Sequence, residues 1–284
     1  MPRPLLTVRK QKWANRRQPD IIRGGVLNNP SIVQARYQAK LDELIGRMTA
    51  GVQSRIREFF HEPHAEEYFA QDASVASQAR IMMNALMKQF NDMFAQRAPD
   101  LATQTANAAD KASSTAFHSA VQELSGGLSI KSTQLTGDLN DIFTASVAEN
   151  VALIKSIPQQ YLQGVQGAIM RSITTGRGMA DLIPLLERNK GITKRRARII
   201  ARDQVKKTYE GLNTGRMRRA GLDHYEWLHS GGSKEPRELH IRMSGKIYSL
   251  SKPPIIDEKT GQRGGPGDLI NCNCRKRLVL SFKD

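Results

Sequence analysis

Apolar residues recur every three or four positions along the first half of the chain, which is the spacing of amphipathic helices. The clearest example lies between residues 29 and 60, where Ser31 follows Pro30 and is suited to cap the start of a helix. Further helices are predicted over about 75–96, 101–124, 132–157, 158–175 and 179–188. Pro99 and Pro158 should each end a helix, because proline lacks the backbone donor. The pattern predicts an antiparallel helical bundle over residues 29–157, which we interpret as an assembly domain.

A strongly basic helix is predicted next, over residues 193–220, with Thr193 as its cap and Gly221 as its end. Residues 187–220 contain 12 basic residues and three acidic ones. One helix face is apolar, and a neighbouring stripe is basic. The residues proposed to bind through this stripe are Arg195, Arg198, Arg202, Lys206 and Arg216. Such a stripe can bind a row of phosphates, without reading base sequence, or an acidic protein surface. The alternative is a solvated helix face.

The helical pattern ends at residue 221, and the pattern over residues 222–282 predicts a small α+β module. Strands are expected over 224–229, 245–250 and 275–282, a helical turn over 235–240, and an irregular Pro/Gly-rich stretch over 252–268. The predicted fold class is therefore α+β. A mostly α-helical N-terminal bundle precedes a second domain, residues 158–284, which contains the basic helix and this module.

Within the module, His240, Cys272 and Cys274 are candidate ligands of a structural zinc ion, which favours imidazole and thiolate together. An extended chain would point the two cysteines apart, but a turn at Asn271 or Asn273 could bring them together. The candidates for a fourth ligand are His229, Glu238 and Asp268. The alternative is that His240 makes a structural hydrogen bond while the cysteines pack as small buried groups.

The net charge of +16, from 43 basic and 27 acidic residues, favours a polyanionic or acidic partner. Part of that charge lies in residues 1–28, interpreted as a basic arm that docks on nucleic acid or protein; the alternative is a solvated tail. No stretch approaches the roughly 20 apolar residues that span a bilayer, so no membrane partner is expected. Two cysteines cannot form a disulfide framework.

One ordered set of residues carries a family resemblance. The set is Ala197-Arg198-Ile199-Ile200-Ala201-Arg202-Asp203-Gln204, Asn213, Ala220-Gly221, Trp227, Arg237, His240, Gly245, Pro266-Gly267, Cys272 and Cys274. In this order it resembles the C-terminal domain of phage head-morphogenesis proteins of the Mu F type, over about residues 160–280. The sequence departs from that family at Asp203-Gln204, where the family tends to have Thr-Glu.

The resemblance implies a minor head protein of a tailed phage, present in low copy number inside the virion head near the portal vertex. During assembly such a protein is in the host cytoplasm. The implied partners are the portal protein, phage DNA, and capsid or scaffold proteins. Some relatives carry a toxin domain after this region, and since the sequence ends at Asp284 none is expected here.

No catalytic activity is implied by the resemblance, so we do not expect an enzyme. One alternative is a metal-dependent nuclease or hydrolase that uses the His240 cluster, with Glu238 as a base. The other is a sequence-independent DNA-binding protein unrelated to virions.

Overall fold

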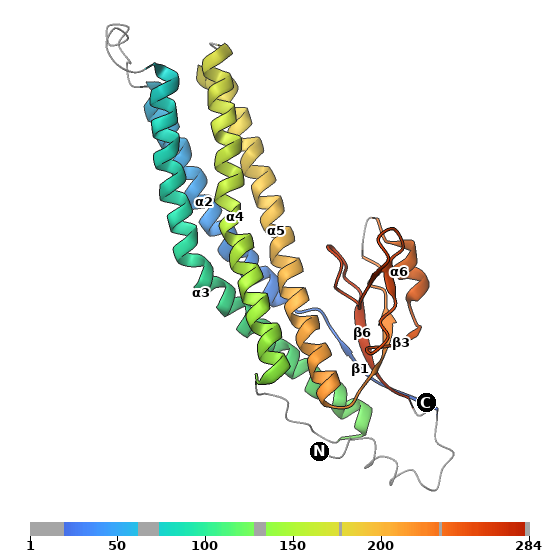
Figure 1. Ribbon diagram of the computed structural model, residues 1–284. Coiled ribbons are helices and arrows are strands. Elements are labelled where there is room, and N and C mark those ends of the chain that lie inside the picture. Colours follow the sequence, from blue (N-terminus) through green and yellow to red (C-terminus); the bar gives the residue numbers. More distant parts are fainter. Residues whose placement is uncertain (1–19, 62–73, 128–134, 176–177, 233–234, 282–284) are drawn as a thin grey trace. The chain divides into compact units, whose positions relative to one another are not determined.

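The computed structural model describes residues 20–61, 74–127, 135–175, 178–232 and 235–281 (Figure 1). Long helices account for most of them: α2 (Ser31–His61), α3 (Val75–Ser125), α4 (Gly137–Thr175) and α5 (Gly178–Arg219). The other elements are β1 (Ile21–Leu27), β2 (His224–Leu228), α6 (Glu238–Met243), β3 (Ile247–Ser249), β4 (Ile255–Asp257), β5 (Gln262–Arg263) and β6 (Arg275–Ser281). The predicted helix-rich α+β fold is confirmed.

The long helices continue through prolines that the sequence pattern placed at helix ends. Pro99 lies inside α3 and Pro158 inside α4, so the predictions that a helix ends at each were wrong. A proline inside a helix costs about 3 kcal/mol, because it removes one hydrogen bond and crowds the preceding turn. Around Pro99 the residues Ala98, Leu101 and Ala102 are all buried, and this packing offsets the cost.

The basic helix also begins earlier than predicted. α5 starts at Gly178, so residues 179–188 and 193–220 form one continuous helix that contains Pro184. Thr193 does not cap a helix but lies inside α5, where its hydroxyl donates to the Asn189 carbonyl at 2.8 Å. This bond satisfies the hydroxyl within the helix, so the residue type that favours a cap is also tolerated in the interior.

Backbone contacts divide the chain into two compact units, each assembled from separate stretches. The first, which we call the sheet unit, comprises Met1–Gln34, Thr105–Ser146 and Arg202–Asp284. The second, the helical unit, comprises Ala35–Gln104 and Val147–Ala201. This differs from the expected division into 1–28, 29–157 and 158–284, because each long helix contributes residues to both units.

The helical unit has an apolar core that also contains a buried polar contact between two helices. The periodic apolar positions of α2, from Leu41 to Ile56, lie in its core. The Tyr37 hydroxyl donates to Asn150 Oδ1 at 2.5 Å, joining α2 to α4. Burial raises the pKa of Tyr37 well above its usual range, so this hydroxyl stays protonated and keeps donating.

The sheet unit is built around a four-stranded antiparallel sheet in the order β1-β6-β2-β3. β1 comes from the segment interpreted as a basic arm, so residues 21–27 are part of the sheet, while residues 1–19 lie outside the described residues. Gly24 and Gly25 let β1 lie close to α3, because a Cβ on either would come within 2.9 Å of α3 atoms. The strand then packs into one core with α3, β2 and β6.

Most of the predicted elements of the C-terminal module are present. β2, β3, β6 and α6 lie within two or three residues of the expected positions. The Pro/Gly-rich stretch over 252–268 is less irregular than expected, because it contains the small hairpin of β4 and β5. None of the helices in the described ranges combines the length and apolar character needed to cross a bilayer.

Candidate metal centre and basic helix

His240, Cys272 and Cys274 converge inside the sheet unit. His240 comes from α6, and both cysteines come from the loop that leads into β6. His240 Nδ1 lies 3.5 Å from Cys272 Sγ and 3.7 Å from Cys274 Sγ, and the three candidate ligand atoms all lie within 4.8 Å of one another. All three side chains are buried, with exposed fractions of 2%, 4% and 2%.

A turn at Asn271 brings the two sulfur atoms together. Asn271 has φ of 61°, in the left-handed region that asparagine tolerates better than most residues. Its backbone N–H donates to Asp203 Oδ1 at 3.0 Å, and the Cys272 N–H donates to the Leu269 carbonyl at 3.0 Å. The turn is one of the two that the sequence allowed, and α5 holds it in place through Asp203.

The imidazole of His240 has a fixed orientation. Its Nε2 lies 3.0 Å from the carbonyl oxygen of Ile256, and its ring meets the Trp227 ring edge-on with centroids 5.0 Å apart. Because a carbonyl oxygen only accepts, Nε2 carries the hydrogen of this bond. In the neutral imidazole Nδ1 therefore presents its lone pair towards both sulfur atoms.

The two thiols also affect each other. A hydrogen bond from Cys274 lowers the pKa of Cys272, whereas the same contact and burial raise the pKa of Cys274. The two thiols therefore titrate as a coupled pair and not independently.

The candidates for a fourth ligand lie elsewhere. His229 Nδ1 accepts a hydrogen bond from the Gly231 N–H at 3.1 Å, and Asp268 Oδ2 accepts one from the Gly265 N–H at 2.7 Å. Glu238 is exposed. Among the described residues, the cluster of possible ligands consists of the imidazole and the two thiols.

Lys206 belongs to the surroundings of this cluster and is not available to bind a phosphate. Its side chain is 1% exposed, and its Nζ donates to the Cys274 carbonyl at 2.7 Å. Burial lowers the pKa of Lys206, against the opposing effects of Glu210 and the two cysteines. The prediction that placed Lys206 in a surface stripe was therefore wrong.

A second buried lysine completes this charged group. Lys276 Nζ lies 3.1 Å from Glu210 Oε2 and donates to Thr214 Oγ1 at 2.8 Å, with its own side chain 3% exposed. Burial raises the pKa of Glu210, against the lowering effects of Lys276 and Lys206. Sequence reasoning missed this group, although Asp203, Lys206 and Glu210 share one face of α5 and mix both signs of charge there.

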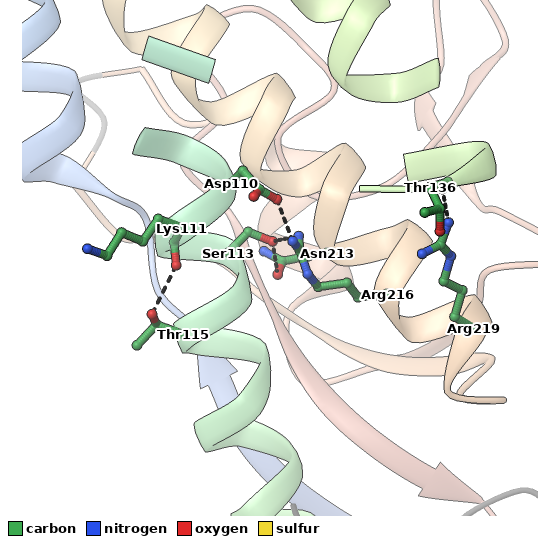
Figure 2. Close-up of polar contacts among 8 residues, drawn as sticks. All are labelled: Asp110, Lys111, Ser113, Thr115, Thr136, Asn213, Arg216 and Arg219. Atoms are coloured by element: carbon green, nitrogen blue, oxygen red, sulfur yellow. Dashed lines mark hydrogen bonds and ion pairs between the residues drawn. The ribbon is translucent and has the colours of Figure 1, made fainter. Parts of the chain in front are cut away.

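Arg216 is also buried, which overturns its assignment to the binding stripe. Its side chain is fully buried and forms an ion pair with Asp110 of α3. It also donates to Ser113 Oγ at 2.6 Å, and that hydroxyl donates to Asn213 Oδ1 at 2.7 Å (Figure 2). These contacts connect α3 to α5 inside the sheet unit, so Arg216 has a structural role.

The remaining residues of the predicted stripe differ from one another in exposure. Arg195 and Arg198, in the helical unit, are exposed, and Lys194 beside them is exposed as well. Arg202, in the sheet unit, is half-buried. The exposed cations of the original stripe are therefore Arg195 and Arg198, which with Lys194 we call the exposed cation cluster.

Comparison with known proteins bears on this same region. Residues 163–277 match the family model described as "Phage Mu protein F like protein". Over these residues the chain is therefore similar to that family. The Mu F-like region contains all of α5, the exposed cation cluster and the His240, Cys272 and Cys274 side chains.

One relative and the solved structures complete the comparison. A stretch of 143 residues is 33% identical to a Haemophilus influenzae protein described as "Uncharacterized protein". The stretch covers 50% of this chain and 30% of that protein, so the chain spans less than a third of the relative it matches. No solved structure matches the chain.

Proposed function

We propose that this chain is a minor head protein that acts at the portal vertex while a tailed-phage head is assembled. The observation that carries the proposal is the Mu F-like region over residues 163–277, since this family belongs to phage head morphogenesis. The proposed partners are the portal protein, phage DNA, and capsid or scaffold proteins. The proposed location is the virion head, after assembly in the host cytoplasm.

A contact with DNA, or with an acidic protein surface, is the role we propose for the exposed cation cluster. Arg195 and Arg198 lie three residues apart, so both can approach neighbouring phosphates from one side of α5. Arginine and lysine side chains that meet phosphates release counterions and bind without reading base sequence. The buried Lys206 and Arg216 are not part of this proposed surface.

The DNA contact is tested by measuring affinity for a DNA duplex between about 50 and 200 mM salt. The variant Arg195→Gln/Arg198→Gln should bind more weakly, and its plot of log affinity against log salt should be flatter by about 1.8, or about 0.9 for each lost contact. Lys88→Gln/Lys155→Gln is the matched control, because it removes the same charge from exposed positions on α3 and α4. Equal slopes for both variants would refute the assignment.

The portal contact needs a separate experiment. The full chain is co-expressed with the portal protein of the same phage, and the portal ring is purified through a tag on the portal. The chain should co-elute with the ring at physiological salt. A chain that is folded by circular dichroism and yet absent from the ring fraction would overturn the portal assignment.

We propose no catalytic role for the His240 cluster. A nuclease or hydrolase needs a ligand position that substrate can reach. The three candidate ligands are each at most 4% exposed, and Glu238 does not join them. A nuclease assay with added divalent metal should therefore show no cleavage above that of a Cys272→Ser variant.

A further inference from the structure

We infer that His240, Cys272 and Cys274 bind one zinc ion, which fixes the loop before β6 to α6. Zinc ligands in proteins lie about 2.3 Å away for thiolate sulfur and about 2.0–2.1 Å away for imidazole nitrogen. At a tetrahedral angle these lengths place nitrogen and sulfur about 3.6 Å apart. His240 Nδ1 lies 3.5 Å and 3.7 Å from the two sulfur atoms, so both nitrogen–sulfur separations are close to those that the ion requires.

Hydrogen bonding alone accounts for this arrangement less well than a bound metal ion does. With Nε2 bonded to the Ile256 carbonyl, neutral His240 has one lone pair, at Nδ1. That lone pair can accept a proton from one thiol, whereas the structure places both sulfur atoms at nearly equal distances from it. A metal ion uses the lone pair and both sulfur atoms at once.

The orientation of His240 is typical of a metal ligand. Ligating histidines usually donate their other ring N–H to a carbonyl or a carboxylate, which fixes the ring and its tautomer. The Ile256 carbonyl of β4 fills that position at 3.0 Å, and Trp227 packs against the ring. An ion at Nδ1 would therefore connect β4, α6 and the cysteine loop through one imidazole.

The chemistry of the donor atoms selects the metal. Two thiolates and an imidazole favour zinc over magnesium or calcium, which prefer oxygen ligands. Two thiolates also balance the charge of a divalent ion, so the buried site gains no net charge. Since His229 and Asp268 are bonded elsewhere, a small non-protein ligand such as water is the fourth ligand that we assign.

Metal content tests this inference directly. The full chain, purified without chelator, should contain about one equivalent of zinc by elemental analysis. His240→Asn and Cys272→Ser should each lose it. The matched control is His229→Asn, which changes another histidine of the same module and should keep the metal. Less than about a tenth of an equivalent in the wild type, both as purified and after dialysis against zinc, would overturn the inference.

Two measurements on the wild-type chain keep the test valid if a variant fails to fold. Cobalt exchanged into the site should give thiolate-to-cobalt charge-transfer absorption, and the intensity of its visible bands should be that of a four-coordinate ion. A chelator should lower the melting temperature of the wild type, and added zinc should restore it. Cobalt bands without sulfur charge transfer, or a melting temperature that the chelator leaves unchanged, would count against the site. None of these readouts involves portal or DNA, so they stand apart from the proposed function.

Discussion

The ion pair between Arg216 and Asp110 gives the sharpest test of which basic residues in α5 are structural. Arg216 is fully buried, whereas the Asp110 side chain is 17% exposed. Removing one partner of a buried pair costs about 3–5 kcal/mol, because the other charge is left without compensation. The cost should therefore depend on which charge is left behind.

Asp110→Ala leaves the guanidinium buried without its carboxylate. Ser113 Oγ still accepts from it, so a loss near the lower end of that range, about 3 kcal/mol, is expected. Arg216→Met removes the buried charge and keeps most of the side-chain volume, while Asp110 can still reach water. We expect that variant to lose about 1–2 kcal/mol. The double mutant should lose about as much as Arg216→Met alone, which is well below the sum of the single losses.

The assay is urea unfolding followed by tryptophan fluorescence in a Trp13→Phe background, where the buried Trp227 of the sheet unit is the remaining tryptophan. Arg219→Met is the control, because Arg219 pairs with Asp138 near the surface, with exposed fractions of 31% and 52%. Surface pairs contribute up to about 1 kcal/mol. A loss below about 1 kcal/mol for Asp110→Ala, or additive losses in the double mutant, would refute the reasoning.

Two further predictions concern the pH dependence of stability and helix packing. Partial burial raises the pKa of Asp223, but hydrogen bonds from Ser249 and Ser251 outweigh it and leave the pKa lowered. These hydrogen bonds therefore stabilise the folded state above about pH 4, and their contribution is lost as the pH falls and Asp223 becomes protonated. In urea unfolding, Ser249→Ala/Ser251→Ala should be less stable than the wild type at pH 7 and should approach it at pH 3. A difference in stability that stays constant with pH would contradict this. Gly191→Ala should raise stability by about 0.5–1 kcal/mol, since a Cβ there meets open space inside α5. Gly215→Ala should give no such gain, because its Cβ would come 2.7 Å from a leucine of α4; equal gains in thermal melts would contradict the packing.

Local patterns predicted the parts of the fold that depend on local physics. The apolar spacing from Ile32 to Ile56 does correspond to α2, and the short apolar runs after Gly221 do correspond to β2, β3 and β6. The cysteine loop was predictable too, because asparagine beside Cys272 allows the backbone reversal that the pair needs. In each case a few neighbouring residues determine the outcome.

Long-range packing determines the elements that the local sequence pattern did not predict. β1 pairs with β6, and the Ile21 register partner is Ser281, almost the whole chain away. Residues 21–27 are mostly apolar, with Arg23 as their one basic residue, but Gly24 and Gly25 interrupt the apolar run and weaken the local strand signal. Packing is also decisive at Pro99, which ends a helix in isolation but not where buried neighbours on both sides offset its cost.

The basic residues of α5 show that a count of charges does not by itself predict a binding surface. A stripe at helical spacing predicts a binding surface only if solvent reaches all of it. Here the Lys206 and Arg216 side chains are themselves buried, whereas Arg195 and Arg198 remain exposed. Salt-dependent binding should therefore follow the exposed cation cluster, while changes at the buried Lys206 and Arg216 should alter the free energy of unfolding. A net charge of +16 thus combines two populations of cations, and variants at the two pairs separate them experimentally.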